Sequence, residues 1–363
     1  MIISQEDKNI AVKQAVCDEN IVYILGAGFS AYAGLPVMSN FLTKSKDIYF
    51  ENPEKYKYFE DLFKEFDKMA KIKNYFTSNL FNIEEILSVL EMNVAVGGET
   101  KTRDNFKTYI KDVIKYYNFD KDDFRLYKDR DLGSLDEKPF SSKNDVINRY
   151  GYFVASLLHT KLFNMKETYY IQGELQSSKD HYSIITFNYD MIIEQIKKHI
   201  EFFTGKIEDG ILDIYKLHGS VDGDIIPPTW AKSITPEMKS IWSGAFLKLQ
   251  DATQIRIIGY SLPITDSYFR YFLKSALLEN NRLKKIDIIC YDANGSVSKN
   301  YLEFIDSQFP NFRFVNKKID DYLFDLKNAT VKNRRDFLSF DKLEEVHEKF
   351  MTVKTDDERL FNF

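Results

Sequence analysis

The feature that most constrains this chain of 363 residues is a short glycine turn directly after an apolar segment near the N-terminus. Ile21–Leu25 reads Ile-Val-Tyr-Ile-Leu, which is typical of a buried strand. Gly26-Ala27-Gly28 follows at once, and an Ala- and Ser-rich turn then opens a predicted helix. Glycines at this place let the backbone approach a pyrophosphate, and the helix N-terminus neutralises its charge. The segment therefore predicts a phosphate-binding turn, with a purely structural turn as the alternative.

The same glycines fit the Gly-x-Gly-x-x-Ala fingerprint of dehydrogenases, in which an acidic residue follows about 20 positions later. That residue would lie near Asp47, in a segment with a helical pattern and not at the end of a strand. A hydride-transfer enzyme is therefore disfavoured.

Strand and helix patterns alternate in the second half of the chain, which favours a parallel sheet with helices on both faces. The predicted strands are Tyr182–Phe187, Ile211–Leu217, Gln254–Gly259, Lys285–Tyr291 and Phe312–Asn316. The predicted helices between them are Met191–Ile200, Asp266–Leu278 and Ser298–Gln308. The fold class is thus α/β, a Rossmann-like doubly wound parallel sheet with a large helical insertion and a helical C-terminal tail.

The long segment between the first strand and the rest of the sheet needs a helical subdomain of its own. Its clearest helix is Asn82–Met92, with Asn82 as the predicted N-cap. We predict a sheet domain from residues 1–38 and 146–325, a helical insertion from 39–145, and an interaction tail from 326–363. Further predicted helices are Ser4–Cys17 and Asp145–Met165, and the charged segment Asp120–Asn144 is predicted to be a surface loop.

Composition excludes several classes of protein. The formal net charge of −5 gives no support for direct nucleic-acid binding. Two cysteines, Cys17 and Cys290, cannot form a four-thiolate zinc site or a disulfide scaffold, and their apolar neighbours predict buried thiols. No run of about 18 apolar residues predicts a membrane span. The N-terminus lacks the pattern of a signal peptide, so the predicted location is cytoplasmic.

Polar clusters follow four of the predicted strands at the point where each one ends. They are the glycine turn after Leu25, Thr186–Asp190, His218–Ser220 and Gly259–Pro263. Ligands of a doubly wound sheet bind at the carboxyl ends of its strands. The four clusters therefore predict one shared crevice.

Together these motifs resemble the sirtuin family. The matching segments are Gly26-Ala-Gly28 with Ser30 and Gly34-Leu-Pro36, then Thr186-x-Asn188-x-Asp190, His218-Gly219 and Gly259-Tyr-Ser261. Their order and spacing agree with the family across roughly residues 20–295. The resemblance implies an NAD-binding Rossmann-like domain with NAD as the substrate.

The chain also departs from the family in two ways. Sirtuin deacylases continue the first motif with Asp-Phe-Arg, whereas Pro36–Phe41 contains no arginine. They also carry a four-cysteine zinc module, which two cysteines cannot supply. Asn82–Glu85, together with Gly259–Pro263, instead resembles a divergent bacterial sirtuin-like branch associated with NAD⁺ hydrolysis in antiphage defence. The departures put protein deacylation in doubt and leave NAD⁺ binding in place.

Cleavage of the nicotinamide–ribose bond passes through an oxocarbenium-like state, so the enzyme needs to hold the pyrophosphate and position a water molecule. Asn188 and His218 are the predicted catalytic residues. Asn188 can bind ribose hydroxyls and water, and His218 can accept a proton from a hydroxyl or from the water. The residues predicted to hold NAD are Gly26, Ala27, Gly28, Ser30, Thr186, Asp190, Gly259, Ser261, Asp292 and Asn294, of which the last two follow from the resemblance alone.

Simpler structural roles stand beside these assignments. His218 can be an ordinary turn residue, and either Asn188 or Asp190 can be the N-cap of the helix that follows. His159, His181, His199 and His347 are interpreted as structural or solvent-facing. No cluster with metal-ligand spacing occurs, so no metal is expected.

The leading prediction is an NAD⁺ glycohydrolase that produces nicotinamide and ADP-ribose as a regulated effector of antiphage defence. Control would come from a homo-oligomer, or from a partner such as a HerA-type ATPase or an Argonaute-like protein. The alternatives are an NAD-dependent protein deacylase or ADP-ribosyltransferase, and a non-catalytic NAD or ADP-ribose sensor.

Overall fold

The computed structural model describes residues 19–71, 82–124, 138–141, 144–165, 170–226, 236–264, 266–305, 309, 311–332 and 337–352. The helix predicted at Ser4–Cys17 lies outside these residues. None of the helices in the described part of the chain combines the length and the apolar character that a bilayer crossing requires.

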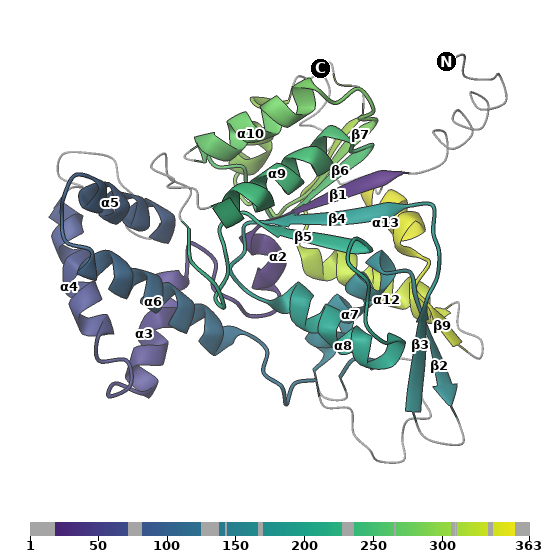
Figure 1. Ribbon diagram of the computed structural model, residues 1–363, viewed down its shortest axis with the longest axis horizontal. Helices are drawn as coiled ribbons and strands as arrows, with labels where there is room; N and C mark the ends of the chain where they lie inside the picture. Colours follow the sequence, from purple (N-terminus) through teal and green to yellow (C-terminus); the bar gives the residue numbers. More distant parts are fainter. Residues whose placement is uncertain are drawn as a thin grey trace.

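A six-stranded parallel sheet forms the centre of the molecule (Figure 1). Its strands in spatial order are β5 (Leu212–Lys216), β4 (His181–Thr186), β1 (Asn20–Leu25), β6 (Gln254–Ile258), β7 (Lys285–Ile289) and β8 (Phe312–Val315). Numbered along the chain within this sheet, the order is 3-2-1-4-5-6, which is the doubly wound order of dinucleotide-binding folds. The predicted fold class and all six strands are confirmed.

Helices cover both faces of the sheet because side chains of successive strand residues point to opposite sides. On β1, Ile21, Tyr23 and Leu25 join the core on one face, whereas Val22 and Ile24 join the core on the other. Figure 1 shows the two helical layers on either side of the strands. The first layer contains α7 (Asp145–Leu157), α8 (Ile192–Thr204), α12 (Ile319–Lys332) and α13 (Leu343–Thr352), and the second contains α9 (Pro236–Gln250), α10 (Ser267–Leu278) and α11 (Ser296–Leu302).

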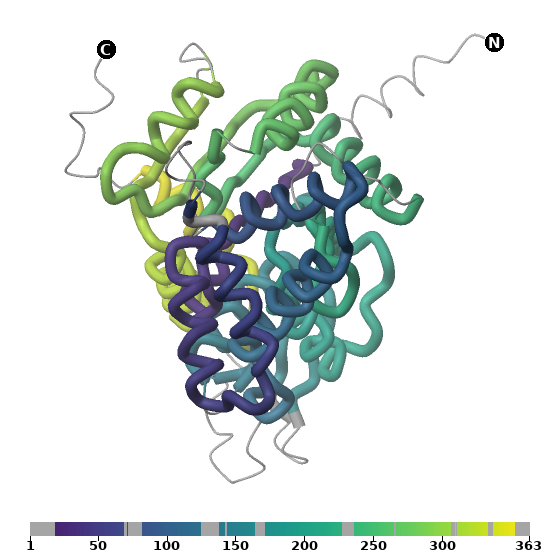
Figure 2. The backbone as a smooth tube through the Cα atoms, turned by 90° about the vertical axis from the view of Figure 1, so that its left-hand side faces the viewer, coloured from purple at the N-terminus to yellow at the C-terminus, as the bar shows by residue number. Residues whose placement is uncertain are grey.

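The insertion after β1 forms a lobe made of helices beyond the end of the sheet (Figures 1 and 2). Its helices are α3 (Phe41–Glu51), α4 (Phe59–Ala70), α5 (Ile83–Ala95) and α6 (Lys101–Tyr117). The lobe has an aromatic core, in which the ring centroids of Phe59 and Tyr109 lie 4.7 Å apart and those of Phe106 and Tyr109 lie 5.6 Å apart. Asn82 caps α5, as predicted, because its Oδ1 accepts hydrogen bonds from the N–H groups of Glu84 and Glu85.

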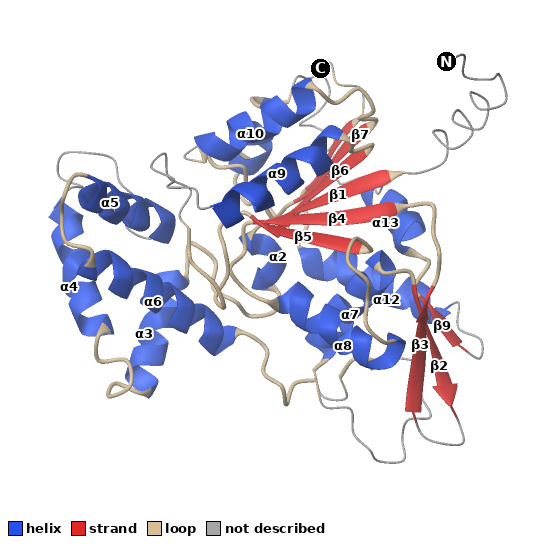
Figure 3. Ribbon diagram, viewed as in Figure 1, coloured by secondary structure: helices blue, strands red, loops and turns tan. Residues whose placement is uncertain are grey.

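A second sheet, which the sequence patterns did not predict, lies apart from the first (Figure 3). It is antiparallel and contains β3 (Tyr170–Leu175), β2 (Thr160–Met165) and β9 (Phe337–Ser339). The predicted helix Asp145–Met165 is therefore wrong after Leu157. His159 has a positive φ of 49°, which ends the helical path.

Two other predictions need correction. The described part of the predicted surface loop contains Phe140, which is fully buried. Its backbone N–H donates to Asn148 Oδ1, and its ring occupies the space that a side chain at Gly151 would fill. The predicted helix Ser298–Gln308 is also shifted, since α11 ends at Leu302. Helix α9 was not predicted.

The segment after Asp325 is only partly helical, because β9 separates α12 from α13. Leu343, Val346 and Phe350 of α13 are buried in the main core. The interaction role predicted for residues 326–363 stays a prediction, and so do the predicted domain boundaries. Of the two predicted buried thiols, Cys290 is buried and Cys17 lies outside the described residues.

Candidate functional site

A cavity of about 750 Å³ opens at the carboxyl ends of the parallel strands, which is the size of a typical small-molecule site. It spans the boundary between β1 and β6, where the strand order reverses and where such folds bind ligands. The helical lobe closes one side through Ile83, Glu84 and Ile114. The predicted site residues that line the cavity are Ala27, Gly28, Ser30, Asn188, Asp190, His218, Gly259 and Ser261.

The glycine turn after β1 packs directly against the turn after β6. Gly28 N–H donates to Gly259 O at 2.8 Å, and Gly26 N–H donates to Ile258 O at 3.0 Å. A Cβ placed on Gly28 would lie 2.8 Å from Gly259 Cα, and one on Gly259 would lie 2.2 Å from Phe29 N. The glycines are therefore required for contact between two turns, and the Gly28 N–H that was assigned to phosphate already has a protein acceptor.

Three predicted residues form one hydrogen-bonded group at the floor of the cavity. Asn188 Nδ2 donates to Ser30 Oγ and to Gly26 O, both at 2.9 Å. Ser30 Oγ in turn donates to Asp190 Oδ2 at 2.6 Å. The group joins α2 (Ala27–Ala31) to the loop between β4 and α8. It positions the Asn188 side chain from two elements at once.

Asp190 also holds the start of α8, since its Oδ1 accepts from Ile192 N–H at 3.1 Å. This bond confirms the structural role that was set beside the ligand role for Asp190, and the ligand role stays a prediction. Asn188 makes no such bond to α8 among the described residues. Thr186 lies behind the cavity wall, where its Oγ1 accepts from Asn188 N–H at 3.1 Å and donates to Leu25 O.

His218 follows β5 and is 1% exposed. Its position is fixed by the tight turn at Gly219, where φ is 76°, and by its own carbonyl, which accepts from Ile226 N–H at 2.9 Å. The imidazole ring lies 5.1 Å from the ring of Phe187 and 6.1 Å from that of Tyr189, measured between centroids. Neither ring nitrogen has a hydrogen-bond partner among the described residues. A buried polar group usually has such a partner, so an unpaired imidazole at a cavity wall is evidence for a ligand.

The charged group nearest to this imidazole is Glu84, which sequence reasoning did not select. Its Oε1 lies 3.6 Å from His218 Nδ1, and Glu84 also lines the cavity. Glu84 belongs to the first turn of α5, after the Asn82 cap. The cap pattern marks the start of the helix, but no local pattern indicates that this turn reaches the end of β5.

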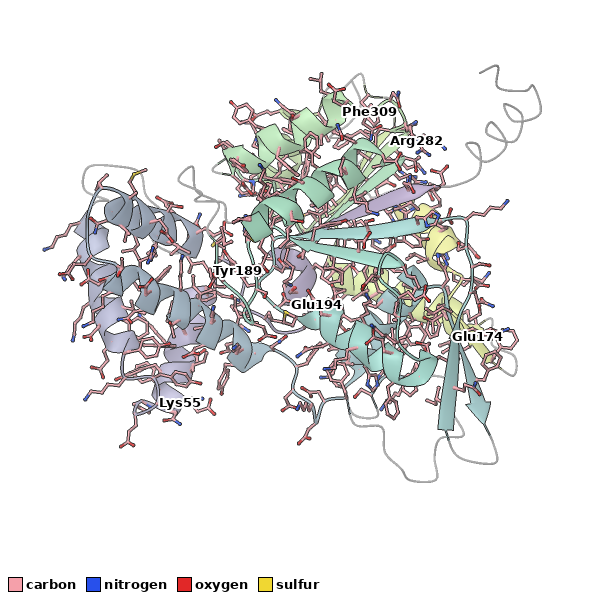
Figure 4. All side chains as sticks on the ribbon, viewed as in Figure 1. Lys55, Glu174, Tyr189, Glu194, Arg282 and Phe309 are labelled. Atoms are coloured by element: carbon pink, nitrogen blue, oxygen red, sulfur yellow. The ribbon has the colours of Figure 1, made fainter. Side chains whose placement is uncertain are left out.

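Aromatic side chains form a second wall of the cavity and were also missed. The rings of Phe187 and Tyr260 stack at 4.5 Å, and the Tyr260 hydroxyl donates to Asp266. Burial raises the pKa of Tyr260 well above its usual range, and the Asp266 carboxylate adds to the effect. Burial likewise raises the pKa of Tyr189, with a contribution from Glu84. Figure 4 labels Tyr189 between the helical lobe and the end of the sheet. Both phenols therefore stay protonated at neutral pH.

The far end of the cavity is formed by the segments after β7 and β8. Cys290, Tyr291, Lys317 and Lys318 line it. Burial raises the pKa of the Cys290 thiol to about 12, and Asp292 contributes, so this cysteine is not a thiolate nucleophile. The two lysines are the cationic side chains among the described lining residues.

Asp292 and Asn294 are not among the described lining residues. Asp292 Oδ2 accepts from the Ser298 N–H and hydroxyl, at 2.9 and 2.8 Å. Burial alone would raise the pKa of Asp292, but these hydrogen bonds lower it overall. Asn294 Oδ1 accepts from Ser296 N–H at 3.1 Å. Both residues thus order the turn before α11, and their predicted adenosine contacts stay predictions.

Within the described ranges, no group of three or more His, Cys, Asp or Glu side chains is arranged to hold a metal ion. Three other histidines have structural surroundings: His347 is fully buried, and burial lowers the pKa of His159 and of His199.

No protein-family model and no curated protein sequence matches this chain. Several sirtuin (Sir2) structures are among the solved structures that resemble it. One is Sir2 with an inhibitor, 2′-O-acetyl-ADP-ribose and a deacetylated p53 peptide, at 11% identity over 89% of this chain and 98% of that one, with a TM-score of 0.34. Another is a mutant Sir2 homologue with 2′-O-acetyl-ADP-ribose, at 14% identity over 96% and 100%, with a TM-score of 0.36. A third is a Sir2 bound to a propionylated peptide, at 9% identity over 89% and 97%, with a TM-score of 0.34.

Proposed function

We propose that the protein is an NAD⁺ glycohydrolase, which cleaves the bond between nicotinamide and ribose with water. The observation that carries the proposal is the unpaired imidazole of His218, 1% exposed, at the wall of a cavity that also contains the Asn188–Ser30–Asp190 group. The ring nitrogens of a buried histidine are usually hydrogen-bonded, and a cavity lined by converging polar side chains is the usual form of a small-molecule site.

The reaction breaks the C1′–N bond, whose electron pair goes to the nicotinamide ring nitrogen, and forms a new bond from C1′ to the oxygen of water. His218 accepts the proton that the water loses, because a neutral imidazole has one free acceptor nitrogen. Asn188 donates through Nδ2 within the protein, so its Oδ1 can accept a hydrogen bond from a ribose hydroxyl or from the water. Asp190 carries a negative charge that favours the oxocarbenium-like transition state.

The rest of the cavity suits a long, polar ligand with two different ends. The aromatic wall of Phe187 and Tyr260 lies beside His218, where a planar nicotinamide ring would stack. Lys317 and Lys318 lie at the other end, where the diphosphate or the adenosine side would bring negative charge. NAD⁺ combines an aromatic end and an anionic centre in this way.

The biological setting of the proposal comes from the motif resemblance given above. On that basis the enzyme is a cytoplasmic effector of antiphage defence that depletes NAD⁺. Uncontrolled hydrolysis would harm the cell that makes it, so activity would depend on a homo-oligomer or on a partner such as an ATPase or an Argonaute-like protein.

The test is release of nicotinamide from NAD⁺ by the purified protein at several concentrations, beside His218→Ala and Asn188→Ala. We expect release by the wild type without any peptide, and its loss in both variants. A steep dependence on protein concentration would indicate activation by assembly.

An arm with an acetylated peptide separates the alternatives. Turnover only with the peptide would replace hydrolysis by deacylation or by ADP-ribosyl transfer. Binding of NAD⁺ without turnover at any concentration, also after addition of cell extract, would indicate a sensor and would overturn the proposal.

A further inference from the structure

The first turn of α5 brings a carboxylate from the helical lobe to the buried imidazole after β5. Glu84 Oε1 and His218 Nδ1 are 3.6 Å apart, although 134 positions separate the two residues, the difference between 218 and 84. The side chain of His218 is 2% exposed and that of Glu84 is 22% exposed. His218 is thus largely screened from solvent, whereas Glu84 is partly exposed to the cavity.

The position of Glu84 is fixed by its own helix. Asn82 Oδ1 accepts from the N–H groups of Glu84 and Glu85, at 3.0 and 3.1 Å, which holds the turn in one conformation. Ile83, Ile86 and Leu87 of the same turn are buried and anchor it to the core. A capped and anchored helix start is a rigid support for a side chain at a site.

The imidazole of His218 lies near the Glu84 carboxylate but makes no hydrogen bond to it. Both ring nitrogens of His218 are unpaired among the described residues, and the rings of its aromatic neighbours Phe187 and Tyr189 are tilted relative to the imidazole. A separation of 3.6 Å is slightly longer than a hydrogen bond, for which about 2.7–3.2 Å is usual. A shift of less than about 1 Å between the lobe and the sheet would therefore form the bond.

We propose that Glu84 is a positioning residue for His218: its carboxylate accepts the Nδ1–H of the imidazole and leaves Nε2 free to take a proton in the cavity. This inference rests on the proposed function for its chemical consequence. It adds a role for the helical lobe, which completes the site across the boundary with the sheet domain. An orienting carboxylate selects one tautomer of a histidine base and fixes the plane of its ring.

Three variants test the proposal. Glu84→Met keeps the length of the side chain and removes the acceptor, whereas Glu84→Gln keeps an amide oxygen that can still accept from Nδ1–H. Glu85→Met is the matched control, because it removes a carboxylate from the same helix turn at a position that does not line the cavity. We expect kcat for nicotinamide release to fall at least about tenfold in Glu84→Met with little change in KM. Glu84→Gln should recover much of the loss, and Glu85→Met should match the wild type.

A second readout does not depend on activity. In protein labelled with ¹⁵N-histidine, the ring-nitrogen shifts report the tautomer, and the His218 signal is identified by its absence in His218→Ala. We expect the Nδ1–H tautomer in the wild type and in Glu85→Met, and the Nε2–H tautomer in Glu84→Met. The same tautomer in all three proteins would overturn the inference, whatever the activities are. Absence of nicotinamide release in the wild type would instead count against the proposed function, and the spectra would still decide the role of Glu84.

Discussion

Two fully buried histidines of this molecule have opposite surroundings. His218, at the cavity, has no hydrogen-bond partner on either ring nitrogen among the described residues. His347, on α13, has a partner on both: its Nε2 lies 2.9 Å from Asp287 Oδ2 and its Nδ1 lies 3.1 Å from the Tyr322 hydroxyl. The bonded histidine is part of the support of the fold. No described hydrogen bond offsets the desolvation of the His218 ring nitrogens, which is the arrangement expected of a histidine that binds a ligand.

The surroundings of His347 form a partly buried network that we call the α13 charge cluster, defined as Arg256, Asp287, Arg313, Glu344, His347 and Glu348. Arg313 makes two hydrogen bonds of 2.7 Å to Asp287, and Arg256 donates to Glu344 and to the Tyr23 hydroxyl, each at 2.8 Å. Arg256 Nε is the unpaired exception. The hydrogen bonds of this cluster connect α13 to the central sheet, and nearly all of its charged groups have a hydrogen-bond partner.

The largest effect is expected from removing one charge of this cluster. Arg256 is 0% exposed and cannot lose its proton, so Glu344→Ala leaves a buried cation without its main partner. We expect the free energy of unfolding to fall by about 3–5 kcal/mol, as measured by urea denaturation. Glu345→Ala is the matched control, since its side chain is 71% exposed and pairs with Lys342 at the surface. Equal effects of the two substitutions would mean that the cluster does not support the fold.

The second largest effect is expected in the pH dependence of stability, to which His347 contributes. Burial, together with the positive charge of Arg256, lowers the pKa of His347 to about 4. The unfolded chain binds this proton near pH 6.5 and the folded chain does not, so the contribution is fully present above about pH 6.5 and is lost as the pH falls to about 4. It amounts to about 3 kcal/mol. His347→Gln should flatten this part of the curve of unfolding free energy against pH, and an unchanged slope would contradict the assignment.

At the cavity, the fold is stabilised by close backbone packing between two turns and not by a cluster of charged side chains. Gly28→Ala would place a Cβ 2.8 Å from Gly259 Cα, so one of the two turns has to move. We expect a loss of about 1–3 kcal/mol in unfolding free energy. Gly223→Ala is the control, because among the described residues its Cβ would meet Ser220 Oγ alone, at 3.4 Å. If both substitutions are tolerated equally, the contact between the turns is not what requires glycine.

The smallest effect on stability is expected from replacing the N-cap residues of two helices, only one of which lies beside the cavity. Asn82 caps α5 beside the cavity, and Asn144 caps α7 by accepting from the N–H groups of Val146 and Ile147. Replacement of either by Ala should cost about 1 kcal/mol in urea denaturation. Only Asn82→Ala should also lower nicotinamide release per folded molecule, because it loosens the turn that carries Glu84. An equal loss of activity in both would show that general stability, and not the position of Glu84, limits the reaction.

Local patterns were sufficient to predict the parts of the fold that depend on neighbouring residues. The strand at Ile21–Leu25, the cap at Asn82 and the five parallel strands after residue 181 follow from short-range patterns, whereas helix α9 between two of those strands was not predicted. The doubly wound order then places four strand ends at one edge, which is why Ser30, Asn188 and His218 were expected to share a cavity.

Features that depend on distant pairing could not be predicted in this way. Strand β2 looked helical although its hairpin partner β3 is close in the chain; only its other partner, β9, lies far along the chain, with Lys161 opposite Ser339. Phe140 looked like part of a surface loop because its burial depends on the space over Gly151. Glu84 was missed for the same reason: its approach to His218 is set by how the helical lobe docks on the sheet.

The most direct test of the central claim compares the two buried histidines in one experiment. Nicotinamide release and urea unfolding are measured on the same preparations of the wild type, His218→Gln and His347→Gln. We expect His218→Gln to lose at least about a hundredfold in release while its unfolding free energy stays within about 1 kcal/mol of the wild type. We expect His347→Gln to keep its activity per folded molecule and to change mainly the response of stability to pH. Full activity of His218→Gln, or a loss of activity in both variants that follows their stability, would contradict the account.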